Sequence, residues 1–191
     1  MAKTEFKAES KRLLDLMINS IYTHKEIFLR EIISNASDAT DKRYYNAMVN
    51  GETGLNRDEL SIDITIDKDS RTLTVTDHGC GMTEEELNTN LGTIAKSGSF
   101  DFKANQEKND DIDIIGQFGV GFYSAFMVSK NVKVITRSEN STQGYVWESD
   151  GADGYTITPC EKDSIGTEII MTIKDNEGED SYDDFLDVYH I

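Results

Sequence analysis

The hydrophobic pattern of the chain changes its period near residue 50, and this change limits the folds that the chain can adopt. From Ala8 to about Asn50 the apolar residues recur at helical spacing, with a break near residues 22–24 that divides the segment into two helices. Beyond residue 60, short runs alternate apolar and polar residues, as half-buried strands do. Helices followed by strands with interleaved short helices predict an α+β two-layer sandwich, in which helices cover one face of a mixed, mostly antiparallel sheet.

The rest of the chain divides into shorter expected elements. Leu60 to Asp67 and Arg71 to Thr76 read as a hairpin, and Thr83 with Glu86 forms a capping box that opens a short helix. A further helix is expected from Phe118 to Val128. Further strands are expected over residues 132–137, 144–148, 155–158 and 167–173. Residues 179–191 are expected to form an acidic helical stretch whose apolar side chains have no evident partner, as in a chain cut from a longer protein.

Charge and cysteine content restrict the classes of partner. The 191 residues include 36 acidic and 19 basic ones, for a net charge of −17, which argues against duplex DNA or an anionic membrane as the main partner. No apolar run approaches the ~18 residues of a membrane span, and the first residues do not resemble a signal peptide. Cys80 and Cys160 are too few for a disulfide framework, which favours the cytoplasm. We therefore expect one cytoplasmic domain over residues 1–191, without nucleic-acid or membrane partners. A small anionic ligand stays possible, because it responds to one pocket.

One face of the expected second helix carries a polar stripe. Glu31, Asn35, Asp38 and Lys42 fall within about 60° of one another at 100° per residue. The stripe borders the apolar face that contains Ile32, and partly buried polar groups need partners or a function. The alternative is an i,i+4 surface network that ends in Lys42.

An acidic residue at the end of an expected strand is followed by two spaced glycines. The Asp77 carboxylate could accept a hydrogen bond from an amine such as the exocyclic amine of adenine, and Gly79 and Gly81 permit close backbone approach to a flat ligand. The alternative is an ordinary Asp/Gly turn.

Three further glycines precede the helix expected after Phe118. In the pattern Gly116-x-x-Gly119-x-Gly121, backbone N–H groups could point at phosphate oxygens, with support from the helix dipole. The spacing is neither that of a Rossmann fingerprint nor that of a Walker loop. Gly166-Thr167, at the start of the last expected strand, indicates by itself only a turn.

The order of these segments distinguishes between the alternatives. The chain contains Glu31-x-x-x-Asn35-x-x-x-Ala39, Asp77-x-Gly79-x-Gly81, Gly116-x-x-Gly119-x-Gly121 and Gly166-Thr167. This order resembles the four-motif ATP-binding module of the GHKL superfamily: type II topoisomerase subunits, histidine kinases, MutL-type repair proteins and heat shock protein 90 chaperones. The segments 25–31, 90–98 and 115–125 resemble the chaperone family, close to its bacterial HtpG type. The resemblance covers only the N-terminal nucleotide-binding domain of that longer protein, without its middle and C-terminal domains.

The resemblance implies a role for each matching residue. Glu31 is the expected general base toward water, and Asn35 is expected to hold Mg²⁺ on the ATP phosphates. Asp77 is expected to bind the adenine amine, together with Thr167 and the backbone near Gly81. The other nucleotide-binding residues that it implies are Asp38 behind the phosphates, Met82 and Phe122 on the nucleoside, Asn90, Leu91 and Lys96 near the sugar or phosphates, and the amides of Gly119, Val120 and Gly121.

Two residues depart from the family pattern. His78 stands where the family usually has Asn, and Cys80 where it usually has Ile or Val. The histidine introduces possible pH sensitivity and the cysteine possible oxidation, unless both are tolerated drift.

The resemblance also implies a function. It describes a chaperone domain for protein folding and the stress response, in which Mg²⁺-dependent ATP hydrolysis closes a lid at about residues 92–121. Hydrolysis is expected to be slow in this chain alone, because in the family the cation that stabilises the γ-phosphate comes from the next domain. Expected partners are ATP, ADP, ATP-competitive inhibitors of the family and unfolded clients, with a homodimer at full length and a monomer for this chain. The alternatives are a histidine kinase catalytic domain and a nucleotide-gated interaction module.

Overall fold

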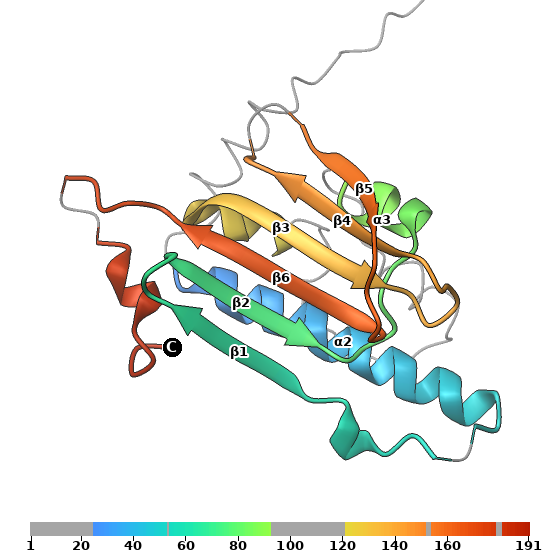
Figure 1. Cartoon of the computed structure of the whole chain (residues 1–191). Coiled ribbons are helices and arrows are strands. Elements are labelled where there is room, and N and C mark those ends of the chain that lie inside the picture. Colours follow the sequence, from blue (N-terminus) through green and yellow to red (C-terminus); the bar gives the residue numbers. More distant parts are fainter. Residues whose placement is uncertain (1–24, 53, 93–120, 152–153, 179–180) are drawn as a thin grey trace, which may run out of the picture.

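The computed structural model of the chain describes residues 25–52, 54–92, 121–151, 154–178 and 181–191 (Figure 1). The helix expected between residues 8 and 22 and most of the expected lid, residues 93–120, lie outside the described residues. Among the described residues, no helix is long and apolar enough to cross a membrane.

A six-stranded sheet forms one layer of the molecule. Its strands are β1 (Ile62–Asp67), β2 (Thr72–Asp77), β3 (Ser129–Arg137), β4 (Gly144–Ser149), β5 (Thr156–Cys160) and β6 (Gly166–Ile173). Their order is β1-β2-β6-β3-β4-β5, and every pairing between these strands is antiparallel. The α+β class is confirmed, and the sheet that was expected to be mixed, mostly antiparallel, has antiparallel pairings throughout its described strands.

Helices form the second layer. The long helix α2 (Ile27–Val49) runs across one face of the sheet (Figure 1). The short helix α3 (Glu84–Asn90) begins at the predicted capping box, in which the Thr83 hydroxyl accepts from the Glu86 N–H and the Glu86 carboxylate accepts from the Thr83 N–H. The 3-10 helices in the described residues are η1 (Arg57–Glu59), η3 (Gly121–Met127) and η4 (Asp183–Leu186).

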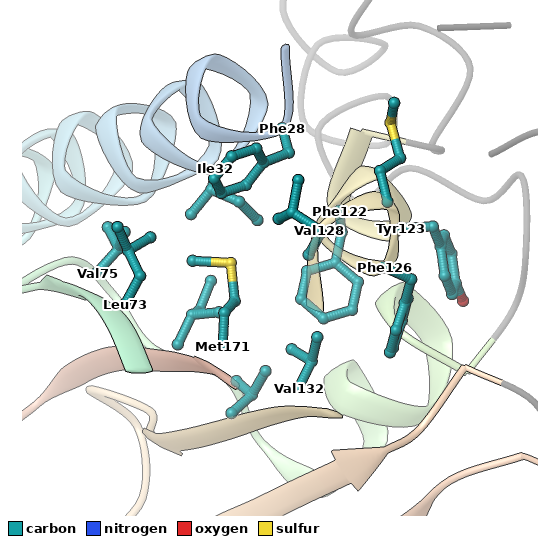
Figure 2. Packing of buried hydrophobic residues seen from close by; sticks show 14 of the residues in the cluster. Phe28, Ile32, Leu73, Val75, Phe122, Tyr123, Phe126, Val128, Val132 and Met171 are labelled. Atoms are coloured by element: carbon teal, nitrogen blue, oxygen red, sulfur yellow. The ribbon is translucent and has the colours of Figure 1, made fainter. Parts of the chain in front are cut away.

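The core lies between α2, η3 and the inner face of the sheet. Phe28 and Ile32 of α2 point toward Leu73 and Val75 of β2 and toward Met171 of β6 (Figure 2). The strands alternate buried and half-buried residues, so one face of the sheet supplies the core. Burial of each large apolar side chain of this kind contributes about 2 kcal/mol to stability.

Two sequence-based expectations need correction. The segment after Phe118 was expected to be α-helical, but its described part, Gly121–Met127, is a 3-10 helix. The helical stretch expected near the C-terminus is wrong as well: the described part contains only the short η4. Tyr182, Phe185 and Leu186 are buried in the core cluster rather than unpartnered. Their partners lie far away in the sequence, so local periodicity could not show them.

Candidate functional site

The Asp77 carboxylate is buried at the end of β2. Asp77 pairs with Thr167 across the β2–β6 ladder, is 6% exposed, and its Oδ1 accepts from the Gly79 N–H at 2.8 Å. Burial raises the pKa of Asp77 to about 6, because the backbone hydrogen bonds from Gly79 and Thr167 offset only part of the desolvation. A carboxylate offers about four acceptor positions, so it retains capacity for a further donor.

The turn after Asp77 is pressed against α2 and against the end of β3. A Cβ on Gly79 would lie 2.6 Å from the carbonyl carbon and the Cβ of Ala39, and the Cys80 N–H donates to the Ala39 carbonyl at 3.1 Å. Gly81 has a left-handed φ of +62°, and a side chain there would collide with the Arg137 carbonyl. Both glycines of the Asp77 segment are therefore required by contact, and the contact with Gly79 explains the small residue at Ala39.

A buried threonine that was not singled out from the sequence connects the strand ends. The fully buried Thr136 on β3 places its Oγ1 3.0 Å from the Oγ1 of Thr167, and it accepts from the Met82 N–H at 3.0 Å. It also donates to the Gly166 carbonyl at 3.2 Å. The alternation along β3 could have predicted that Thr136 is buried, because it follows Val132 and Val134 in the inward-facing positions of the strand.

The polar stripe on α2 contains one buried carboxylate. Glu31 is 8% exposed, and burial raises its pKa, opposed by the neighbouring positive charge of Arg30. A Cβ on Gly121 would lie 2.5 Å from the Glu31 Oε2, so the start of η3 is packed against this carboxylate. Asn35 and Asp38, farther along α2, are exposed.

Residues at the end of α3 pack against η3. Leu91 is buried, and its carbonyl accepts from the Tyr123 hydroxyl at 2.6 Å. The buried Phe122 ring meets the Trp147 ring edge-to-face, with centroids 5.4 Å apart. Asn90 is half-buried.

The predicted site residues thus form two groups on the described chain. One group lies at the strand ends and contains Asp77, Gly81, Met82 and Thr167. The other lies around Glu31 and Gly121. Helix α2 touches both groups, through Ala39 and Glu31 respectively. Lys96, Gly119 and Val120 lie outside the described residues.

The two unusual residues of the turn have different surroundings. The His78 ring lies near the start of β1, with Nδ1 3.2 Å from the Ser61 carbonyl and 3.4 Å from its hydroxyl. The Cys80 thiol is buried, and burial raises its pKa to about 11. Thiolate formation at this residue is suppressed, which favours tolerated drift over sensitivity to oxidation.

Comparisons with known proteins agree with this architecture. Residues 22–175 match the family described as histidine kinase-, DNA gyrase B- and HSP90-like ATPases. The whole chain aligns with the chaperone protein HtpG of Clostridium acetobutylicum at 61% identity, covering 31% of that protein. It aligns with the chaperone protein HtpG of Bacillus subtilis at 62% identity, covering 30% of it. The chain therefore spans about a third of the length of these relatives. The match over most of its residues shows that the chain belongs to the family of histidine kinase-, DNA gyrase B- and HSP90-like ATPases.

Proposed function

We propose that this chain is the ATP-binding and ATP-hydrolysing domain of an HtpG-type molecular chaperone. The observation that carries the proposal is the buried Asp77 carboxylate, which is joined by the strand pairing to Thr167 at the end of the sheet. Family membership and whole-chain similarity to HtpG chaperones support the same conclusion.

In this proposal, Asp77 accepts a hydrogen bond from the exocyclic amine of adenine. The surroundings of Asp77 fit this ligand. The protein's own hydrogen bonds offset only part of the effect of burial on the Asp77 pKa, so a further hydrogen bond from the amine would stabilise the charged carboxylate. Thr167 pairs with Asp77 across the neighbouring strands, and the Thr136 hydroxyl fixes the Thr167 hydroxyl by a hydrogen bond. Thr136 also holds the backbone at Met82, so the base-binding surface is set before the ligand arrives.

Asn35, Asp38 and the residues near Gly121 form the proposed phosphate end. Asn35 is exposed, and its side chain offers an amide oxygen, which is a type of ligand that Mg²⁺ accepts in proteins. Bound Mg²⁺ would neutralise charge on the phosphates. We propose further that Asn90, Leu91, Lys96, Phe122 and the amides of Gly119, Val120 and Gly121 complete the nucleotide contacts.

Glu31 is the proposed general base. Its raised pKa makes it a better proton acceptor than an exposed glutamate, and its contact with Gly121 fixes it beside the chain that carries the phosphate-binding amides. The lid over residues 92–121, slow turnover in this chain alone, a monomeric state for the chain, a full-length homodimer, client and inhibitor binding, and a cytoplasmic location stay predictions.

Calorimetric titration with ADP and Mg²⁺, combined with single-turnover ATP hydrolysis, tests the proposal. The wild-type chain is expected to bind ADP, Asp77→Asn to bind it at least about tenfold more weakly, and Glu31→Gln to retain binding while losing hydrolysis. An unchanged affinity in Asp77→Asn would refute the adenine assignment. Loss of both binding and hydrolysis in Glu31→Gln would assign that residue a structural role.

A further inference from the structure

We propose that Phe185, in the segment that follows the sheet, is a positioning residue for hydrolysis: it fixes the first turn of α2 and thereby the Glu31 carboxylate. The inference rests on the proposed role of Glu31 as general base. It assigns a contribution to hydrolysis to a part of the chain that contains none of the four nucleotide-binding motifs.

The start of α2 has no side-chain cap among the described residues. The residue at its N-cap, Glu26, has helical backbone angles, no side chain caps the helix there, and the first turn contains no acidic residue. A capped helix satisfies its first N–H groups with a side-chain oxygen and gains from a negative charge near them. Among the described residues, the N–H groups of Phe28 and Leu29 donate to the carbonyls of Lys25 and Glu26, and further support for this turn comes from side-chain packing.

The C-terminal segment supplies such contacts. The ring of Phe185 meets that of Phe28 edge-to-face, with centroids 5.3 Å apart and planes at 90°. Just before the helix, the Lys25 ammonium lies 4.4 Å from the centroid of the Tyr182 ring and donates to its hydroxyl at 3.3 Å. Phe28 is fully buried, and Tyr182 and Phe185 are 8% and 9% exposed.

The segment is itself held in place. The Asn176 side chain accepts from the Tyr182 N–H and donates to the Asp183 carboxylate, each at 2.7 Å. Arg71, which immediately precedes β2, donates to the Asp183 carboxylate at 2.7 Å and to the Lys174 carbonyl at 2.6 Å. Phe185 is thus presented to α2 by a fixed structure and not by a free tail.

Phe28 transmits this support to Glu31. The two residues are three apart in one helix, so they lie on neighbouring positions of the same face, about 60° apart. Glu31 is also confined by Gly121, where an added Cβ would lie 2.5 Å from the Glu31 Oε2. If the Phe28 ring loses its partner, the first turn of α2 can shift, and the carboxylate leaves the position from which it acts on water.

The adenine-binding group is far from this contact. Asp77 ends β2, whereas Arg71 immediately precedes β2, and the C-terminal segment folds back beside that opposite end of the sheet (Figure 1). Loss of the Phe185 ring should therefore reduce hydrolysis without a matching loss of nucleotide affinity.

The test compares four forms of the chain by ADP titration and single-turnover ATP hydrolysis, well below their melting temperatures. Phe185→Leu is expected to lower the hydrolysis rate about tenfold and to change the ADP Kd by less than about twofold, in keeping with the sensitivity of catalysis to small displacements. Phe185→Tyr, which keeps the ring, should restore most of the rate. Val188→Ala, at a residue that is 68% exposed in the same segment, is the matched control and should behave as wild type.

A double-variant comparison sharpens the result. Phe28→Leu alone should reduce the rate about as much as Phe185→Leu, and the two together should reduce it little further, because either change removes the same contact. Equal losses of rate and affinity in Phe185→Leu, or an unchanged rate, overturn the inference. If the wild-type chain does not bind ADP, the proposed function fails first and this inference with it.

Discussion

The buried carboxylate of Asp77 predicts that adenine affinity depends on pH. Its pKa lies at about 6 in the folded chain against an ordinary value of 3.8, and burial is the main cause. Only the ionised carboxylate is a full acceptor for the adenine amine. With a pKa of about 6, about nine-tenths of the chains are ionised at about pH 7 and about one-tenth at about pH 5. The apparent Kd is the intrinsic value divided by this fraction, so it should rise about tenfold between these two conditions.

The direction of the change in affinity with pH follows from which form of Asp77 binds adenine. Lowering the pH protonates Asp77 and weakens binding, whereas raising it above about pH 7 changes little because ionisation is nearly complete. Adenosine is the appropriate ligand, because phosphate groups titrate near pH 6 and would obscure the effect. Its Kd can be measured by ligand-observed NMR across this range.

Two variants separate Asp77 from its neighbour. Asp77→Asn should bind adenosine weakly and without the pH dependence, since its amide does not titrate. His78→Asn should keep the dependence with its midpoint moved slightly upward, because burial is the main cause of the Asp77 pKa and the His78 charge is a minor one that lowers it. A flat profile in the wild-type chain, or a profile that persists in Asp77→Asn, would refute the assignment of Asp77 as the titrating acceptor.

Three further changes test the packing around the site. Thr136→Val should lower the free energy of unfolding by about 1–3 kcal/mol in urea titrations, because it leaves the half-buried Met82 N–H without its acceptor. A loss below about 0.5 kcal/mol would contradict this. Gly121→Ala should slow single-turnover hydrolysis more than it weakens ADP binding, because the added Cβ forces the Glu31 carboxylate to move. Equal effects on the two measurements would show that the contact between Gly121 and Glu31 is unimportant for hydrolysis. In a Cys160→Ser background, iodoacetamide should alkylate Cys80 only as fast as the chain opens, since burial raises the pKa of that thiol to about 11. Labelling within minutes under native conditions would disprove its protection.

The elements predicted well are those whose determinants are close in the sequence. The capping box needs only Thr83 and Glu86, three residues apart, and the β1–β2 hairpin needs only the alternation on each side of one turn. Helix α2 follows from an uninterrupted run of helix-forming residues. Each of these elements lies within two residues of its predicted bounds, and α2 begins at Ile27, three residues after the expected break at residues 22–24.

The features that were missed depend on residues far apart in the chain. The C-terminal segment is held in place by contacts with Phe28 and Arg71, which stand more than 100 residues earlier in the sequence. The periodicity of the segment itself could not predict these contacts. The importance of Thr136 appears only when β3 lies beside β6 and its hydroxyl meets that of Thr167. The motif residues were selected by order and spacing, whereas the reason for Ala39 is visible only as its contact with Gly79.

The position of β6 has a consequence for how the domain is made. Among the six described strands of this sheet it is the last to be synthesised, yet it lies in the interior of the sheet between β2 and β3. A nascent chain that stops before Gly166 has two separate strand groups with open edges at β2 and β3, which are ready to pair with other chains. It also lacks the strand that joins Asp77 to Thr136. On the proposed function, nucleotide binding requires the complete sheet, so nucleotide cannot assist folding before β6 has been synthesised.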